Sequence, residues 1–308
     1  MSLKIIFMGT PEFSVPILKT IEASKHKIIA VYTQPPKKKS RGQKIIKSPV
    51  HEYAQQMKLT VRCPASLDSE EEYNFIKMLN ADIAIVVAYG KLLPLKILNL
   101  NNTKFLNIHA SLLPKWRGAA PIQRAIMNMD KVTGISIMKI IEELDAGPVM
   151  KFIKIDLKKD SNYESLSHEI SSLSSSVIID CLDIVEKGKE RFIPQDSTKA
   201  TYAKKIKKEE TKINWNDKAK NIVAKINALY PNPGSWFKLG KSRIKVLKAK
   251  EIKIQGNPGE IINEKLTIGS SENSVQILKL QKEGKKSMKV NDFLVGNKID
   301  VGSNLNET

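Results

Sequence analysis

The sequence predicts an α/β fold in which a doubly wound, mostly parallel sheet is followed by a small OB-like β-barrel. Residues 3–33 run as strand, turn, helix and strand, which is the order of a βαβ unit. Residues 82–88, DIAIVVA, form a continuous apolar run that is typical of a strand buried on both faces of a parallel sheet. From residue 243 onward, short strand-like runs alternate with turns, which is typical of a small barrel.

The first βαβ unit consists of Leu3–Met8 as a strand, Phe13–Ala23 as a helix and Lys27–Thr33 as a second strand. The turn after the first strand begins at Gly9 and has no further glycine. It therefore lacks the G-x-G-x-x-G pattern that lets a backbone approach a pyrophosphate, and this disfavours a nicotinamide-dependent dehydrogenase.

The rest of the N-terminal part continues the alternation of helices and strands. A helix is expected over Ser48–Met57, with Ser48 as its cap and Pro49 in its first turn. Another is expected over Ser69–Leu79, where glutamates in the first turn suit the helix dipole. The further predicted elements are strands at Leu59–Arg62, Asp82–Ala88, Phe105–Ile108, Thr133–Ile140 and Met150–Leu157, and a long helix at Tyr163–Glu186.

The C-terminal part follows a stretch of little periodicity, residues 188–203, which indicates a linker. An amphipathic helix is expected over Asp217–Tyr230. The predicted strands beyond it are Arg243–Ile254, Gly259–Asn263, Lys265–Ile268 and Val275–Leu280, with a short helix at Lys286–Phe293. A basic small barrel attached by a linker is typical of a nucleic-acid-binding module.

The composition is that of a soluble globular protein, with 41% hydrophobic and 27% charged residues among 308. No run approaches the ~20 apolar residues of a membrane span, and the start shows no signal segment, so we expect no membrane and a cytoplasmic location. Cys63 and Cys181 lie far apart and share no metal-ligand spacing with the four histidines, so we expect free thiols and no metal.

The chain carries a formal net charge of +19, most of it from lysine. Residues 190–308 hold 24 Lys and Arg against 13 Asp and Glu, a net of +11, so the C-terminal part is the more basic per residue. A surplus of this size favours a polyanionic partner, although a solvated lysine-rich surface gives the same composition.

The strand at Phe105–Ile108 delivers two polar side chains, Asn107 and His109, to one face of the sheet. The carboxyl end of a strand is where an open α/β sheet usually places its chemistry. An amide and an imidazole both supply N–H donors that suit an oxyanion developing on a carbonyl. On spacing alone, a turn-capping Asn107 and an ordinary packed His109 are equally compatible with the pattern.

Two loops have alternatives that the residues alone leave open. Gln34–Lys47, QPPKKKSRGQKIIK, is either a flexible solvated loop or a basic finger that orders on a phosphate backbone. Asp145, in the segment IEELDAGPV, is on local pattern a turn residue beside Ala-Gly-Pro.

The run NIHASLLPKWRGAAPIQRAI at residues 107–126 resembles the signature of the folate-dependent formyltransferases. Its ending is similar to the branch of that family that acts on methionyl-tRNA. Four further segments resemble the same branch: MGTPEFS, TQPP followed by a basic loop with Arg-Gly, VVAYGKLLP and ELDAGPV. In the second half TYAKKIKKEE, INW and a P-x-P-G-x-W loop add to the resemblance, while Asn227 stands where the family usually has arginine.

The resemblance implies an enzyme that moves a formyl group from 10-formyltetrahydrofolate to the α-amino group of methionine on initiator tRNA, in support of translation initiation. It implies that Asn107 and His109 donate to the oxyanion. It also implies that Asp145 faces this pair, orients His109 and assists proton transfer. The folate-binding residues it implies are Ser111, Leu112, Leu113 and Pro114, and the tRNA-binding residues are Arg41, Lys37, Lys38, Lys39 and Lys44.

The corresponding organisation is a catalytic domain over residues 1–189, a linker over 190–205 and an OB-like tRNA-binding domain over 206–308, in a monomer without metal.

Two alternatives belong to other functional classes. A formyltransferase acting on a small substrate, such as an amino sugar or a glycinamide ribonucleotide, shares Asn107, His109 and Asp145 but does not need the basic loop. A nucleic-acid-binding protein with an inactive sheet domain needs the charge and tolerates loss of those three residues.

Overall fold

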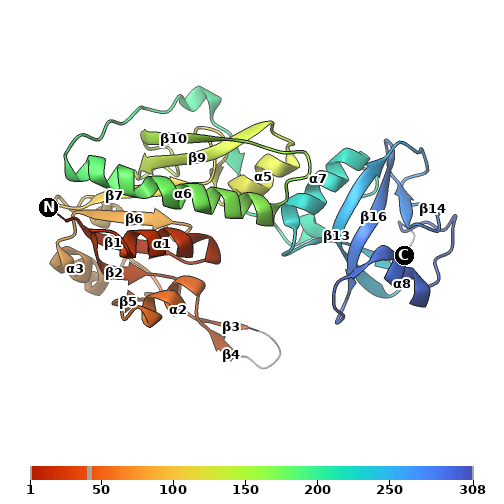
Figure 1. The fold of residues 1–308 in the computed structure, drawn as a ribbon, viewed down its shortest axis with the longest axis horizontal. Coiled ribbons are helices and arrows are strands. Elements are labelled where there is room, and N and C mark those ends of the chain that lie inside the picture. Colours follow the sequence, from red (N-terminus) through yellow and green to blue (C-terminus); the bar gives the residue numbers. More distant parts are fainter. Residues whose placement is uncertain (1, 40–43, 307–308) are drawn as a thin grey trace. The chain divides into compact units, whose positions relative to one another are not determined.

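The computed structural model describes residues 2–39 and 44–306 (Figure 1). The chain divides into two compact units. The N-terminal unit comprises Met1–Pro121, Val132–Asp156 and Ser167–Ala203, and the C-terminal unit comprises Ile122–Lys131, Leu157–Leu166 and Lys204–Thr308. No helix in the described part of the chain is long and apolar enough to cross a membrane.

The N-terminal unit is built on a seven-stranded sheet in the order β10-β9-β7-β6-β1-β2-β5. Its parallel strands are β1 (Lys4–Gly9), β2 (Lys27–Tyr32), β5 (Val61–Arg62), β6 (Ile83–Val87) and β7 (Lys104–His109). Two antiparallel strands, β9 (Val132–Lys139) and β10 (Val149–Asp156), complete one edge. The predicted α/β fold with a mostly parallel sheet is therefore confirmed.

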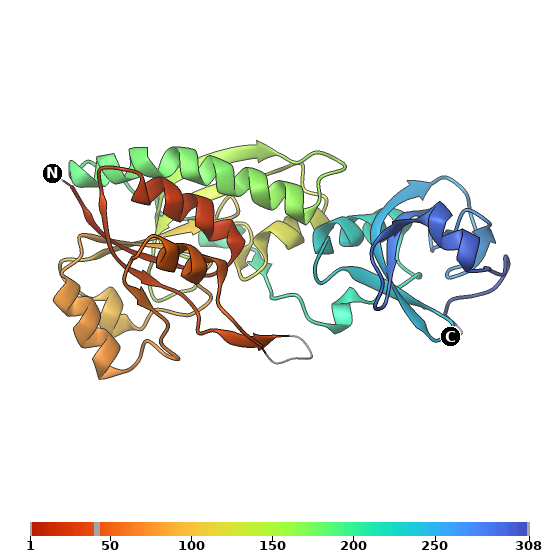
Figure 2. The ribbon, with the colours of Figure 1, turned by 60° about the horizontal axis from the view of Figure 1, so that its bottom comes forward.

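Helices cover both faces of this sheet (Figures 1 and 2). Ile6 and Met8 of β1 pack in one apolar cluster with Ile76 of α3 and Ile97 of α4. Ile5 and Phe7 alternate with them and are fully buried, so they face the opposite layer. The helices are α1 (Val15–Glu22), α2 (Pro49–Gln56), α3 (Glu70–Leu79), α4 (Leu95–Leu98), α5 (Pro121–Met127) and α6 (Tyr163–Glu186).

The helix starts follow the expected chemistry. Ser48 accepts a hydrogen bond from the backbone N–H of His51, and Ser69 accepts one from Glu72, so both serines cap as predicted. Pro121 is the first residue of α5, as expected for a proline in a first turn. The helix predicted from Phe13 begins instead as a single 3₁₀ turn, Glu12–Ser14, and becomes α-helical at Val15.

Neither possibility left open for Gln34–Lys47 included paired strands, and the structure shows them in part of this segment. Strands β3 (Lys37–Lys39) and β4 (Lys44–Ile46) pair antiparallel and form the base of a hairpin. A run of lysines lacks the alternating apolar pattern by which a strand is recognised, so the pairing was hidden from sequence reasoning. Arg41, to which the resemblance gives a tRNA contact, lies outside the described residues.

The C-terminal unit has a curled antiparallel sheet in the order β12-β13-β16-β15-β14, with β17 paired to β16. Among the described strands β12 and β14 do not pair, so the sheet is a half-barrel where the sequence predicted a barrel. Trp215 and Phe237 meet edge to face in its core, with ring centroids 5.7 Å apart. The elements are α7 (Ala219–Leu229), β12 (Ser235–Leu239), β13 (Ser242–Ile252), β14 (Ile261–Asn263), β15 (Thr267–Gly269), β16 (Ser274–Lys282), β17 (Met288–Lys289) and α8 (Val290–Gly296).

The segment for which the sequence indicates a linker, residues 190–205, is mostly bonded to the N-terminal unit. Ile193 forms a bridge with Val149 at the start of β10. Strand β11 (Tyr202–Ala203) pairs in parallel with β8 (Arg117–Gly118), in the loop that follows β7. Pairings this short leave no periodic signal in a sequence, and through them residues 190–203 become part of the sheet unit.

Candidate active site

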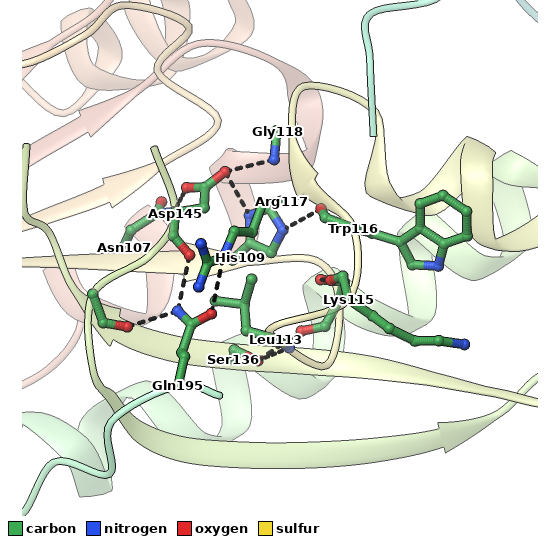
Figure 3. A network of polar contacts seen from close by, with 12 residues as sticks. Asn107, His109, Leu113, Lys115, Trp116, Arg117, Gly118, Ser136, Asp145 and Gln195 are labelled. Atoms are coloured by element: carbon green, nitrogen blue, oxygen red, sulfur yellow. Dashed lines mark hydrogen bonds and ion pairs between the residues drawn. The ribbon is translucent and has the colours of Figure 1, made fainter. Parts of the chain in front are cut away.

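The site forms at the carboxyl end of β7, where the strand delivers Asn107 and His109 (Figure 3). His109 is buried, and its Nε2 lies 2.9 Å from the carbonyl oxygen of Trp116. Because a carbonyl oxygen only accepts, Nε2 carries a proton and donates it. The other ring nitrogen, Nδ1, faces Asp145 Oδ2 at 3.6 Å and is the edge of the ring that remains for chemistry.

Asp145 lies on the loop between β9 and β10 and contacts both members of the pair. Its Oδ2 accepts a hydrogen bond of 2.8 Å from the Gly118 backbone N–H, and its Oδ1 lies 3.4 Å from Asn107 Nδ2, which donates to it. The carboxylate therefore joins the two strand residues to the loop that follows them. Asp145 has a φ of 49°, in the left-handed region that a residue with a side chain rarely adopts, so this turn is held by its surroundings.

The loop Ser111–Pro114 is fixed by the side chains that the resemblance gives to folate binding. The fully buried Ser111 donates from Oγ to the Lys115 carbonyl at 2.6 Å, while Ser136 Oγ donates to the Ser111 carbonyl at 2.7 Å and accepts from Leu113 N. Leu113 packs in the core with Met138 and Val149. Leu112 and Pro114 are the partly exposed members of the loop.

Sequence reasoning missed two residues of the site, Arg117 and Gln195. Arg117 is 1% exposed, and its guanidinium donates to Glu143 at 2.9 Å and to Gln195 Oε1 at 3.1 Å. Gln195 donates to the Asp145 carbonyl. Neither residue has a clear signal in the sequence, because Arg117 stands near Lys115 in a motif with other polar side chains and Gln195 lies in a stretch without periodicity.

The cysteines offer no activated nucleophile. Cys63 Sγ lies 3.3 Å from His51 Nδ1, but burial raises the pKa of the Cys63 thiol and lowers that of the His51 imidazole, so both remain neutral. Burial raises the pKa of Cys181 to about 11. Within the described residues no group of three or more His, Cys, Asp or Glu side chains is placed to hold a metal ion.

The four lysines to which the resemblance gives tRNA contacts belong to strands β3 and β4. Lys37 is exposed and donates to Gln34 Oε1 at 2.9 Å. Lys38 and Lys39 complete β3, and Lys44 begins β4. Asn227, at the position where the family usually has arginine, lies half-buried on α7.

Two family models match the chain. The formyl transferase model matches residues 3–182, and the formyl transferase C-terminal domain model matches residues 205–298. A methionyl-tRNA formyltransferase of Pelagibacter ubique (strain HTCC1062) is 48% identical over 307 residues, covering 99% of both chains. One from Chelativorans sp. (strain BNC1) is 42% identical over 310 residues, covering 99% of this chain and 100% of its own.

Solved structures share the fold at lower identity. HypX from Aquifex aeolicus, in complex with tetrahydrofolic acid, is 18% identical with a TM-score of 0.67, covering 98% of this chain, which spans 51% of that longer one. An N-formyltransferase from Helicobacter canadensis, in complex with folinic acid and dTDP-3-aminofucose, is 19% identical with a TM-score of 0.68, covering 92% of this chain and all of its own.

The likeness to these structures concerns the fold. The sequence comparisons go further, because the two family models cover both parts of the chain and the named relatives match it over nearly its whole length. The chain therefore belongs to the formyltransferase family, in which it groups with the methionyl-tRNA formyltransferases.

Proposed function

We propose that the chain transfers a formyl group from 10-formyltetrahydrofolate to the α-amino group of methionine on initiator tRNA, in the cytoplasm and as a monomer. The observation that carries this proposal is the meeting of Asn107, His109 and Asp145 at the end of β7, in a chain of formyltransferase sequence. The folate supplies the formyl group. Donors beside a carboxylate are the groups that an attack on such a carbonyl requires.

We assign the chemistry of the three residues from their positions and their donor or acceptor groups. As the amine nitrogen bonds to the formyl carbon, the carbonyl electron pair moves onto oxygen, where Asn107 donates an N–H. We assign a second donation to this oxygen to His109 Nδ1, the ring nitrogen that faces Asp145, since Nε2 is bonded to the Trp116 carbonyl. When the carbon–N10 bond breaks, its electron pair stays on N10, which gains a proton, and the amine nitrogen loses one. Asp145 holds His109 in position for this transfer.

The folate-binding part of the proposal rests on the loop Ser111–Pro114. This loop leaves the strand that carries the donors, and its buried hydrogen bonds fix its course. We assign direct contact with the folate to Leu112 and Pro114, and to Ser111 and Leu113 the shape of the loop. The folate-bound structures of the same fold support a folate-derived donor.

The tRNA-binding part rests on charge. Lys37, Lys38 and Lys39 belong to β3 and Lys44 to β4, so this hairpin is rich in positive charge, for which a phosphate backbone is the fitting partner. We assign a tRNA contact to Arg41 as well, from the resemblance alone. We assign residues 1–189 to catalysis, 190–205 to the connection, from which Gln195 reaches the Asp145 loop, and 206–308 to tRNA binding. The basic composition of the C-terminal part supports this division.

A formylation assay tests the proposed acceptor. Purified protein with 10-formyltetrahydrofolate and charged initiator methionyl-tRNA is expected to produce formylmethionyl-tRNA. The matched reactions contain an amino sugar nucleotide or glycinamide ribonucleotide in place of the tRNA, and no transfer is expected in them. Formylation of a small amine without formylation of methionyl-tRNA would leave the fold assignment intact and overturn the proposed acceptor.

The hairpin gives a separate prediction about salt. Replacing Lys37, Lys38 and Lys39 by glutamine is expected to weaken tRNA binding and to reduce the slope of log affinity against log salt by up to about 2–3, because each lost phosphate contact removes about 0.9. The control replaces three exposed lysines outside the hairpin, Lys27, Lys187 and Lys189. Equal slopes for the two triple variants, measured by filter binding from 50 to 200 mM salt, would count against a hairpin–phosphate contact.

A further inference from the structure

Gln195 joins the segment after α6 to the loop that carries Asp145 (Figure 3). Its Nε2 donates to the Asp145 carbonyl at 2.8 Å and to the Gly147 carbonyl at 2.7 Å. Its Oε1 accepts from Arg117 Nε at 3.1 Å. The Gln195 amide nitrogen therefore donates to two carbonyl oxygens of the turn at residues 145–147, and the amide oxygen accepts from the Arg117 guanidinium.

These contacts permit only one orientation of the amide. The two partners in the turn are carbonyl oxygens, which only accept, so the nitrogen of Gln195 must face them. Arg117 only donates, so it must face the oxygen. Arg117 is itself fixed, because its buried guanidinium also donates to Glu143 at 2.9 Å and to Ser197 at 3.3 Å. Arg117, which lies outside the turn, therefore helps to fix the orientation of the Gln195 amide.

The turn that Gln195 contacts packs closely against the end of β9 on its other side. A Cβ built on Gly147 lies 1.8 Å from the carbonyl oxygen of Lys139, which shows how closely the turn approaches the end of β9. Asp145 is held at a positive φ between this strand and Gln195. The direction in which its carboxylate points, toward His109 and the Gly118 N–H, depends on the backbone being held there.

The same segment is attached to the site loop at other points. Thr201 accepts hydrogen bonds from Trp116 N at its Oγ1 and from Arg117 N at its carbonyl, both at 2.9 Å. Strands β11 and β8 pair just beyond. Loss of the Gln195 amide therefore releases the turn at Asp145 and Gly147 while the segment itself stays paired.

We propose that Gln195 is a positioning residue for formyl transfer, which holds the Asp145 turn so that the carboxylate meets His109 and Asn107, and that Arg117 orients Gln195. This inference rests on the role proposed above for Asp145. If it is correct, residues 190–205, which have the sequence pattern of a linker, contribute a structural part of the active site.

The test is Gln195→Glu, which keeps the size of the side chain and its pairing with Arg117 but directs an oxygen at two carbonyl oxygens. We expect kcat to fall by about 10–100-fold, as for loss of an outer hydrogen bond that orients a functional group, with the KM values for folate and tRNA within about twofold of wild type. Gln56→Glu is the matched control, because it makes the same exchange at an exposed position on α2, in the N-terminal unit and outside the residues of the site. We expect its kcat to be unchanged.

A double-variant cycle separates positioning from a general loss of structure. If Gln195 acts through Asp145, adding Gln195→Glu to Asp145→Asn lowers kcat no further, because the carboxylate that it positions is already gone. Independent effects that multiply, or a wild-type kcat for Gln195→Glu, would overturn the inference. A wild-type kcat for Asp145→Asn alone would instead overturn the proposed role of Asp145.

Thermal unfolding of each variant shows whether it is folded. Should Gln195→Glu fail to fold, Gln195→Met supplies a variant of similar volume without the facing oxygen. It is expected to show the same loss of kcat and the same absence of a further effect in the Asp145→Asn background. Effects of Gln195→Met that multiply with those of Asp145→Asn would overturn the inference in the same way.

Discussion

Replacing His109 by alanine is expected to lower kcat for formylation by about 10²–10⁴-fold, with a much smaller change in the KM for either substrate. Two effects contribute. The substitution removes a donor from the position where the formyl oxygen gains charge, which alone costs about 10²–10³ in rate. It also removes the imidazole beside Asp145, and loss of positioned proton transfer by itself costs about 10²–10⁴ where that step is rate-limiting. Because both effects belong to one side chain and groups that act as a unit are not additive, we expect the combined loss to stay within about 10²–10⁴-fold.

The control for this variant is His168→Ala, because His168 is exposed on α6. Steady-state assays on both proteins, with thermal unfolding to confirm that each is folded, give the comparison. His109→Gln is a second variant that fills more of the buried volume than alanine does. If a folded His109→Ala protein keeps a kcat within about threefold of wild type, His109 does not take part in the transfer.

The sequence was informative where chemistry follows a regular element. The alternation of a strand is enough to place Asn107 and His109 side by side, and the apolar runs are enough to predict a mostly parallel sheet. Asp145 is different, since it lies on another loop and no local pattern brings it to β7. Only the resemblance to a known family predicted that it would face the pair, and the structure places it there.

The remainder of the site depends on contacts between segments that are distant in the sequence. Gln195 is 50 residues from Asp145, in a stretch without periodicity, and its partners are backbone carbonyls that a sequence does not distinguish. The same reason explains the hairpin, where the lysines of β3 pair with Ile46, Ile45 and Lys44 of β4 and both isoleucines are exposed. Elements held by main-chain hydrogen bonds alone leave little trace in the choice of side chains.

Replacing Asp145 by asparagine is expected to lower kcat by about 10²–10⁴-fold. The side chain keeps its size, so the loss of activity comes from the missing negative charge and from the changed hydrogen bonding. Asparagine retains one acceptor oxygen, which can still receive the Gly118 N–H. Its amide N–H₂ then takes the place of Oδ1 and faces Asn107 Nδ2, donor against donor, while an uncharged oxygen faces His109 Nδ1. His109 Nδ1 thereby loses the negative charge that it faces in the wild type, and the repelled pair of donors at Asn107 disturbs the turn that orients the imidazole.

The measurement that checks this prediction is single-turnover formylation with saturating folate and methionyl-tRNA, which isolates the chemical step from binding and product release. The matched control is Asp156→Asn, an exposed aspartate at the end of β10. The rate constant is expected to fall for Asp145→Asn and to stay at the wild-type value for Asp156→Asn. Equal rate constants for Asp145→Asn and wild type would show that the carboxylate is a structural contact of the turn, and His109 would then act with Asn107 alone.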